Sequence, residues 1–108
     1  MNEETISQGA VTPRADTAVE RPDGDLVAAR LPVLRSRLTE MVASGVVHLT
    51  LDLAGVKAID STGIGLLVSA HNSLRKAGGE LNVIHVSSDI LELFHAMRIH
   101  QHFSVSGN

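Results

Sequence analysis

The chain has 108 residues, 44% of them apolar, which fits one small domain because a chain of this length needs most of its apolar groups for a single core. A formal charge of −3 and only two aromatic residues, both Phe, argue against a surface that follows phosphates or stacks bases, so nucleic acid is not expected as a partner. The absence of cysteine excludes disulfides, thiolate metal sites and a cysteine nucleophile.

Residues 1–23 are predicted to form an acidic, weakly ordered leader, and residues 24–108 to form the folded domain. Large apolar residues are isolated in the leader, and prolines interrupt it. A short edge strand over residues 17–21 is the regular element expected there. No apolar run has the length of a signal-peptide core or a membrane span, so we expect a cytoplasmic protein without direct membrane insertion.

The segment after the leader has apolar residues at steps of three and four, the spacing of an amphipathic helix. This helix is predicted to begin near Leu31, because Pro32 is tolerated in a helix only in the first turn. Gly45 is expected to close it in the left-handed conformation. Residues 47–53 then alternate apolar and polar side chains, which predicts a strand with one buried face.

Two further helices and two strands are expected in the second half of the chain. Helical spacing resumes at Gly63 and ends at the glycine pair 78–79, and the aliphatic residues 81–86 predict a strand. The serine pair 87–88 supplies the cap of a third helix. The predicted buried stripe of that helix consists of Ile90, Phe94 and Met97. Residues 103–105 are expected to form a last short strand.

Strands and helices in alternation predict an α/β fold, because right-handed crossovers between strands give at least partly parallel pairing. The fold class expected is a small mixed β-sheet with helices mainly on one face. The alternation at residues 47–53 supports a single covered face, since a strand buried on both faces would be apolar throughout.

Residues 60–65 have the sequence Asp-Ser-Thr-Gly-Ile-Gly and lie where a strand gives way to a helix, so their amides are expected at the positive end of a helix dipole. In a structural interpretation, Asp60, Ser61 or Thr62 caps the helix and contributes about 1 kcal/mol. In a functional interpretation, Ser61 or Thr62 is an exposed hydroxyl that another protein phosphorylates. The pattern by itself does not separate the two.

The spacing of residues in this segment does not fit a nucleotide-binding or catalytic motif. A dinucleotide fingerprint would need its third glycine at Val68, and the lysine of a phosphate loop is absent. Ser61 lies outside the G-x-S-x-G setting of a hydrolase nucleophile, so the chain is not expected to be an enzyme. His100 and His102 lack a nearby cysteine or carboxylate cluster that would complete a metal shell, and neither a metal nor another cofactor is expected.

The order of elements and the 60–65 segment together resemble the STAS domains, and among them the anti-sigma factor antagonists of bacteria. The resemblance runs from about Gly24 to Val105. It rests on Gly24-Asp25-Leu26, the 46–53 strand with Asp52, Asp60-Ser61-Thr62-Gly63-Ile64-Gly65-Leu66, and Gly78-Gly79-Glu80-Leu81. Arg98 falls where these domains often have a glycine after the third helix.

The resemblance implies a binding protein controlled by phosphorylation. An unphosphorylated antagonist of this family sequesters an anti-sigma factor that is also a serine kinase, and the sigma factor is released to polymerase. Phosphorylation of the serine after the aspartate breaks the complex, and a phosphatase restores it. Here that serine is Ser61, with Thr62 as the second candidate. The residues expected to contact the partner are Asp60, Ser61, Thr62, Gly63, Ile64 and Gly65.

A second function is compatible with the same resemblance. STAS domains also occur as accessory subunits of lipid-transporting ABC systems, as stressosome components or attached to anion transporters, and there the turn is an assembly surface. This alternative predicts a stable complex with an ABC transporter ATPase that phosphorylation does not affect.

Overall fold

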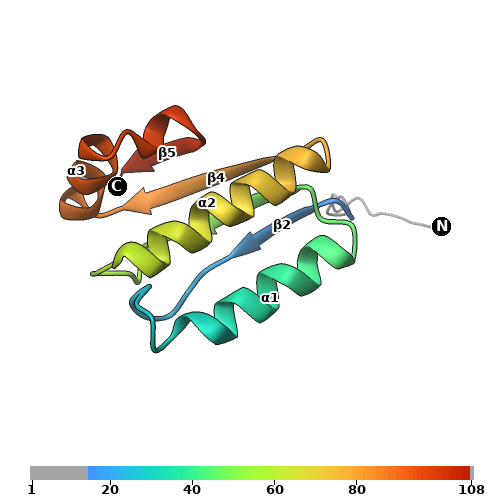
Figure 1. Ribbon diagram of the computed structural model, residues 1–108, viewed down its shortest axis with the longest axis horizontal. Coiled ribbons are helices and arrows are strands. Elements are labelled where there is room, and N and C mark those ends of the chain that lie inside the picture. Colours follow the sequence, from blue (N-terminus) through green and yellow to red (C-terminus); the bar gives the residue numbers. More distant parts are fainter. Residues whose placement is uncertain (1–14, 108) are drawn as a thin grey trace, which may run out of the picture.

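The computed structural model describes residues 15–107. In chain order their elements are β2 (Thr17–Glu20), α1 (Leu31–Ala43), β3 (His48–Asp52), α2 (Ser61–Lys76), β4 (Glu80–Val86), α3 (Ser88–Ala96), the 3-10 helix η1 (Ile99–Gln101) and β5 (Ser104–Gly107). The strands form one sheet in the order β2-β3-β4-β5, and Figure 1 shows α1 and α2 side by side across it, with α3 near β5. No helix in this range is long and apolar enough to cross a membrane.

The sheet confirms the predicted α/β fold class with helices mainly on one face. Leu49 and Leu51 of β3 are buried, whereas the alternate residues His48 and Thr50 are only half-buried. The sequence predicts a mixed sheet. Every strand pair among residues 15–107 is parallel, so no antiparallel pair is observed in this range. The fully buried side chains of the core include Leu49, Leu51, Leu67, Leu74, Val83 and Phe94.

The first helix and the strand after it lie where the sequence places them. α1 begins at Leu31 with Pro32 in its first turn, and Gly45 beyond its end has a φ of 104°. A left-handed residue of this kind favours glycine, because a Cβ would crowd the following carbonyl. β3 occupies five of the seven residues predicted at 47–53.

The later elements follow the predicted order. Gly78, with a φ of 89°, lies just beyond α2, and the next strand, β4, extends the predicted 81–86 by one residue. Ser87 is the N-cap of α3, and its hydroxyl accepts a hydrogen bond from the Ile90 amide at 3.3 Å. β5 begins one residue later and ends two residues later than the predicted 103–105.

The strand expected near residues 17–21 is observed as β2, which pairs with β3. Its last residue, Glu20, is 5% exposed, and the carboxylate pairs with the guanidinium of Arg37 in α1. Such a partner offsets the cost of removing a carboxylate from water. Residues 1–14 of the predicted leader lie outside the described residues.

The predicted buried stripe of α3 is correct for Ile90 and Phe94 and wrong for Met97, which is 48% exposed. α3 ends at Ala96, and Met97 is its C-cap. The chain then turns at Arg98, which has a φ of 60°. Met97 therefore no longer continues the helical periodicity that predicted its burial.

Replacing Arg98 by glycine is expected to stabilise the protein by about 0.5–1 kcal/mol. Arg98 is left-handed, with φ 60° and ψ 27°, and this conformation costs an L-residue about 1–2 kcal/mol. Glycine removes that cost but loses part of the gain to the larger entropy of its unfolded chain. Urea unfolding measures the change, with Arg98→Ala as the control that keeps a Cβ. A glycine variant no more stable than the alanine variant would contradict the expectation.

Candidate functional site

Two carboxylates hold the turn between β3 and α2, and one of them, Asp25, accepts hydrogen bonds from the Lys57 and Ala58 amides. Asp60 is the N-cap of α2, and its Oδ1 accepts a hydrogen bond from the Gly63 amide at 2.9 Å. Its Oδ2 accepts another from the Ala28 amide at 3.0 Å, which ties the segment before α1 to the start of α2. The hydrogen bond from Gly63, followed by that from Ala28, holds the pKa of Asp60 below its ordinary value.

Ser61 and Thr62 are the first two residues of α2, and both are exposed. Of the three residues that the sequence offers as the cap, Asp60 takes that role. Neither hydroxyl makes a side-chain hydrogen bond to another residue in the part of the chain that the structure describes. Both therefore remain accessible to a modifying protein.

The inner side of the turn is pressed against the segment before α1. A Cβ on Gly63 would lie 2.2 Å from the carbonyl oxygen of Leu26 and 2.8 Å from Cγ1 of Ile59. The Leu26 amide donates to the carbonyl of Ala58 at 3.0 Å, and its carbonyl accepts from the Asp60 amide at 3.2 Å. These contacts fix the position of the start of α2 relative to the segment before α1.

Burial divides the six residues predicted to contact a partner into two groups. Gly63 and Ile64 are buried and support the turn from inside. The other members of the segment are exposed or half-buried, namely Asp60, Ser61, Thr62 and Gly65. The accessible part of the site is thus the first turn of α2 rather than the whole motif.

The first turn of α2 also has a favourable electrostatic position for an anion. A helix N-terminus carries unpaired amide hydrogens and a positive partial charge, and this first turn contains no acidic residue. A phosphate on Ser61 would gain from that charge and be repelled by the Asp60 carboxylate next to it. The helix would stay folded while the local surface became strongly negative.

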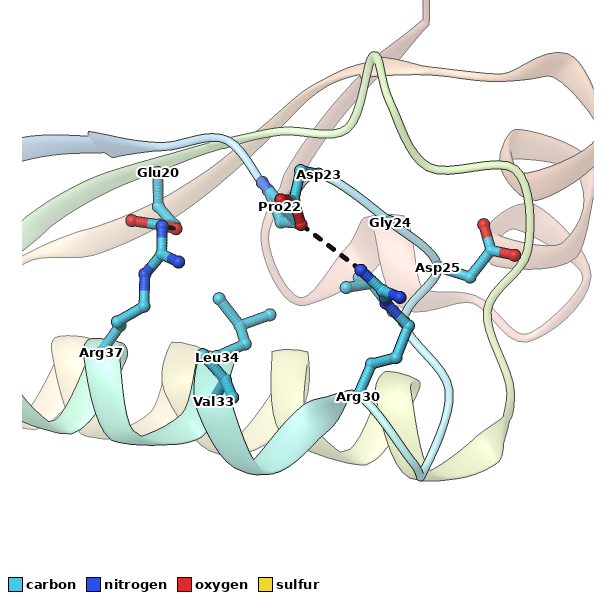
Figure 2. Close-up of a pocket in the computed structure, with 10 residues that line it drawn as sticks. Glu20, Pro22, Asp23, Gly24, Asp25, Arg30, Val33, Leu34 and Arg37 are labelled. Atoms are coloured by element: carbon cyan, nitrogen blue, oxygen red, sulfur yellow. Dashed lines mark hydrogen bonds and ion pairs between the residues drawn. The ribbon is translucent and has the colours of Figure 1, made fainter.

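A pocket of about 280 Å³ lies between α1 and the loop after β2. Figure 2 shows Arg37 and Arg30 at opposite ends of it, with Val33 and Leu34 between them. Arg37 pairs with the buried Glu20, and Arg30 donates to the exposed Asp23 at 3.4 Å. Sequence reasoning missed this pocket, because its charged pairs join residues on different elements.

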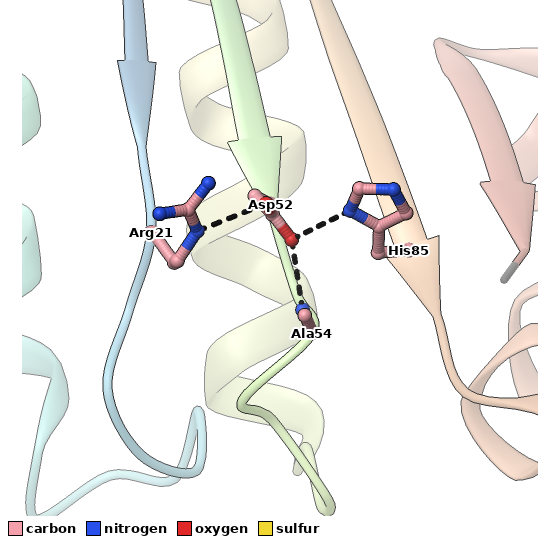
Figure 3. A network of polar contacts seen from close by, with 4 residues as sticks. All are labelled: Arg21, Asp52, Ala54 and His85. Atoms are coloured by element: carbon pink, nitrogen blue, oxygen red, sulfur yellow. Dashed lines mark hydrogen bonds and ion pairs between the residues drawn. The ribbon is translucent and has the colours of Figure 1, made fainter.

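A polar bridge crosses three strands on the face of the sheet opposite α1 and α2. Asp52, at the end of β3, accepts hydrogen bonds from Arg21 Nε and Ala54 N and contacts His85 Nδ1, each at 3.0 Å (Figure 3). The Ala54 amide first, and the His85 and Arg21 side chains after it, lower the pKa of Asp52 to about 2. His85 adopts a φ of 56°, where the β4-β5 register shifts. Sequence analysis identified Asp52 only as part of a strand, since its side-chain partners are 31 and 33 residues away.

Asp52→Asn is expected to destabilise the fold at neutral pH and progressively less in acid. The folded pKa of Asp52 is about 2 against an ordinary 3.8, so its stabilisation is complete above pH 4 and disappears as the pH falls through 2. An amide cannot accept all three hydrogen bonds. Urea unfolding from pH 7 to pH 2 measures the difference from wild type. Asp23→Asn, whose carboxylate is exposed, is the control, and an Asp52 effect independent of pH would contradict the expectation.

Four of the six histidines lie in two ring contacts that involve α2, α3 and η1. The rings of His95 and His100 are 4.6 Å apart, and the buried His71 lies 6.3 Å from His102. Burial, more than the nearby cations, lowers the pKa of His71. Within residues 15–107 no three His, Asp or Glu side chains are grouped so that they could hold a metal ion.

Comparisons with known proteins cover most of the chain. A family model described as the STAS domain matches residues 10–108. The anti-sigma-B factor antagonist of Bacillus subtilis (strain 168) is 32% identical over 71 residues. That alignment spans 66% of this chain and 64% of the relative, a little under two thirds of the relative's own length.

Solved structures share the fold at lower identity. The anti-sigma factor antagonist SpoIIAA in its unphosphorylated form superposes with a TM-score of 0.69 at 18% identity, covering 91% of this chain and 84% of SpoIIAA. The murine anion transporter Slc26a9 superposes with a TM-score of 0.74 at 17% identity, covering 93% of this chain and 17% of the transporter. At such identities the likeness concerns the fold alone.

Proposed function

The chain belongs to the STAS domain family, and from this premise we propose that it is an anti-sigma factor antagonist controlled by phosphorylation. In the unphosphorylated state it binds an anti-sigma factor that is also a serine kinase and so releases the sigma factor. The kinase phosphorylates it, which ends the complex, and a cognate phosphatase returns it to the binding state. It acts by binding, as a cytoplasmic protein, and catalyses no reaction itself.

The observation that carries this proposal is the exposed Ser61 hydroxyl at the start of α2. Asp60 already caps the helix through its hydrogen bond from Gly63, so Ser61 is not needed to stabilise the turn. The exposed Ser61 hydroxyl is accessible to a kinase, and Thr62, also exposed, is the second candidate. The name of the Bacillus subtilis relative supports the same role.

Phosphorylation at this position changes the surface without breaking the core. The phosphate adds about −1.5 to −2 charges at neutral pH, and the helix N-terminus tolerates them. Asp60 lies beside it with its carboxylate ionised, so the first turn of α2 becomes strongly negative. A partner that matched the neutral turn then loses affinity through charge repulsion and through the bulk of the phosphate.

The second candidate function is an assembly module of a transport system or stressosome that phosphorylation does not control. The superposition with part of an anion transporter shows that this fold also occurs within a transport protein. In that role the exposed turn would bind a permanent partner, such as the ATPase of a lipid-transporting ABC system. A complex that is equally stable with Ser61 phosphorylated or unmodified is the expected result for this alternative.

The test is phosphorylation of the full chain by anti-sigma factor kinases of the same organism, each added with ATP. Mass spectrometry of the digested protein is expected to locate one phosphate on Ser61, and Ser61→Ala is expected to abolish it. Phosphate found on Thr62 alone would identify Thr62, rather than Ser61, as the phosphorylated residue. No phosphorylation by any of these kinases would overturn the switch and favour the assembly role.

A further inference from the structure

An apolar groove lies between α1 and α2. Its volume is about 300 Å³, and Leu38 of α1 and Leu66 and Leu74 of α2 form its floor. The groove wall includes Val42 and Ala70, which are only partly buried. This volume is at the lower end of the range of small-molecule sites, and it is large enough for a few anchoring side chains.

The two helices that form this groove are basic, although the chain as a whole is acidic at −3. α1 carries Arg35 and Arg37 against Glu40, and α2 carries two bases in its last turn and no acidic residue. Arg37 is neutralised by Glu20. On these two helices the bases without an ion pair, all exposed, are Arg35, Arg75 and Lys76. Arg35 lines the groove itself.

The charges near the groove indicate what kind of molecule would bind in it. A second copy of the chain would bring the same bases together and be repelled. A lipid bilayer needs protruding apolar side chains, whereas Leu38, Leu66 and Leu74 are at most 4% exposed. An amphipathic helix can place its own apolar side chains into a groove of this shape. An acidic residue along its flank would meet Arg35, the charged side chain among the described residues that line the groove.

We propose that the α1-α2 groove binds an acidic amphipathic helix of the protein partner, in the same complex that the phosphorylation of Ser61 controls. The identity of that partner rests on the proposed function. The binding preference of the groove rests only on its shape and charge.

A phosphate at the N-terminal end of α2 can also affect a partner that lies along this helix. Ser61, Gly65, Ser69 and Ser73 follow one another at steps of four on the exposed side of α2, and Ser69 and Ser73 line the groove. Ser61 lies about 7.5 Å from the level of Leu66, at 1.5 Å per residue. The screening length at physiological salt is about 8 Å, so a dianion on Ser61 repels acidic residues at the near end of the groove.

The test uses two synthetic peptides of 18 residues that share one leucine-rich face, with glutamates on the other face in the first peptide and lysines in the second. Titration into the isotope-labelled full chain is followed by NMR. The acidic peptide is expected to shift the amides of Thr39, Val42, Ala70 and Ser73 and to bind at least tenfold more tightly than the basic peptide. Ser61→Asp is expected to weaken its binding about threefold or more.

Matched variants separate the groove from general charge effects. Ser69→Glu and Arg35→Glu are expected to weaken binding of the acidic peptide about fivefold or more, because both place a negative charge at the groove. Ser104→Glu, on an exposed position of β5, and Lys57→Glu, in the exposed loop after β3, make the same changes elsewhere and are expected to have little effect.

Three results would overturn the proposal: equal affinity for the two peptides, shifted amides outside the groove, or no loss in Ser69→Glu and Arg35→Glu. Concentration-dependent shifts at the same amides without peptide would assign the groove to a second copy instead. Binding to vesicles of anionic lipid through these amides would assign it to a membrane surface, and either finding overturns the helix assignment. Because no kinase is used, failure here leaves the phosphorylation of Ser61 to be decided by its own experiment.

Discussion

Gly63→Ala is expected to destabilise the protein by about 3 kcal/mol, whereas Gly65→Ala, two residues later in the same helix, is expected to stabilise it by about 0.5–1 kcal/mol. A Cβ on Gly63 would lie 2.2 Å from the backbone oxygen of Leu26, and backbone cannot move aside as a flexible side chain does. A Cβ on Gly65 would have no neighbour within 4 Å. The opposite signs follow from this difference, because alanine has the higher helix propensity at both positions.

Urea unfolding of both variants measures the two changes, and the pair serves as its own control for helix propensity. Gly63→Ala is also expected to weaken partner binding, since the clash displaces α2 from the segment around Leu26 and moves the first turn. A loss of less than about 1 kcal/mol for Gly63→Ala would show that the two segments can separate easily. The rigid turn on which the proposed switch depends would then be absent.

Ser61→Asp is expected to reduce binding of the anti-sigma factor at least tenfold while leaving the thermal unfolding temperature nearly unchanged. The added carboxylate joins Asp60 at the exposed start of α2 and repels an acidic partner, and the helix N-terminus tolerates its charge. Ser61→Ala is expected to bind as the wild type does, because Asp60 and not Ser61 caps the helix. Isothermal titration calorimetry with the kinase that phosphorylates Ser61 measures the affinities.

Ser104→Asp, which places the same charge on an exposed residue of β5, is the control for net charge and is expected to bind normally. If Ser61→Asp unfolds the protein, Ser61 is a structural residue and the proposed switch fails. If Ser61→Asp binds as tightly as Ser61→Ala, a negative charge at this position does not control docking. In that case the assembly role becomes the better explanation.

The sequence predicts local structure well where one residue type has one strong effect. Pro32 fixes the start of α1, and Gly45 and Gly78 end their helices because both adopt positive φ. Met97 shows the limit of periodicity. Its spacing fits the buried stripe of α3, but the helix ends one residue earlier, and nothing in the spacing marks that end because Arg98 occupies the left-handed position.

The candidate site is predicted only in part for a related reason. The sequence identifies Asp60, Ser61 and Thr62 as residues at a helix start, but it leaves open which of them is the cap. In the structure Asp60 caps the helix through the Gly63 amide, and its other oxygen bonds to the Ala28 amide, 32 residues away. The bridge of Asp52 with Arg21 and His85 and the buried pair of Glu20 and Arg37 are long-range contacts of the same kind.

The sequence by itself determined the order of helices and strands, the fold class and the segment that carries the exposed hydroxyls, because these follow from periodicity, from glycine and proline, and from residues adjacent in the chain. Only the tertiary structure decided that Asp60 is the cap, that Gly63 and Ile64 face inward, and that an apolar groove lined by Arg35 lies between α1 and α2. Each of these depends on which distant segments parallel strand pairing and helix packing bring together, and such contacts leave no local pattern in the chain.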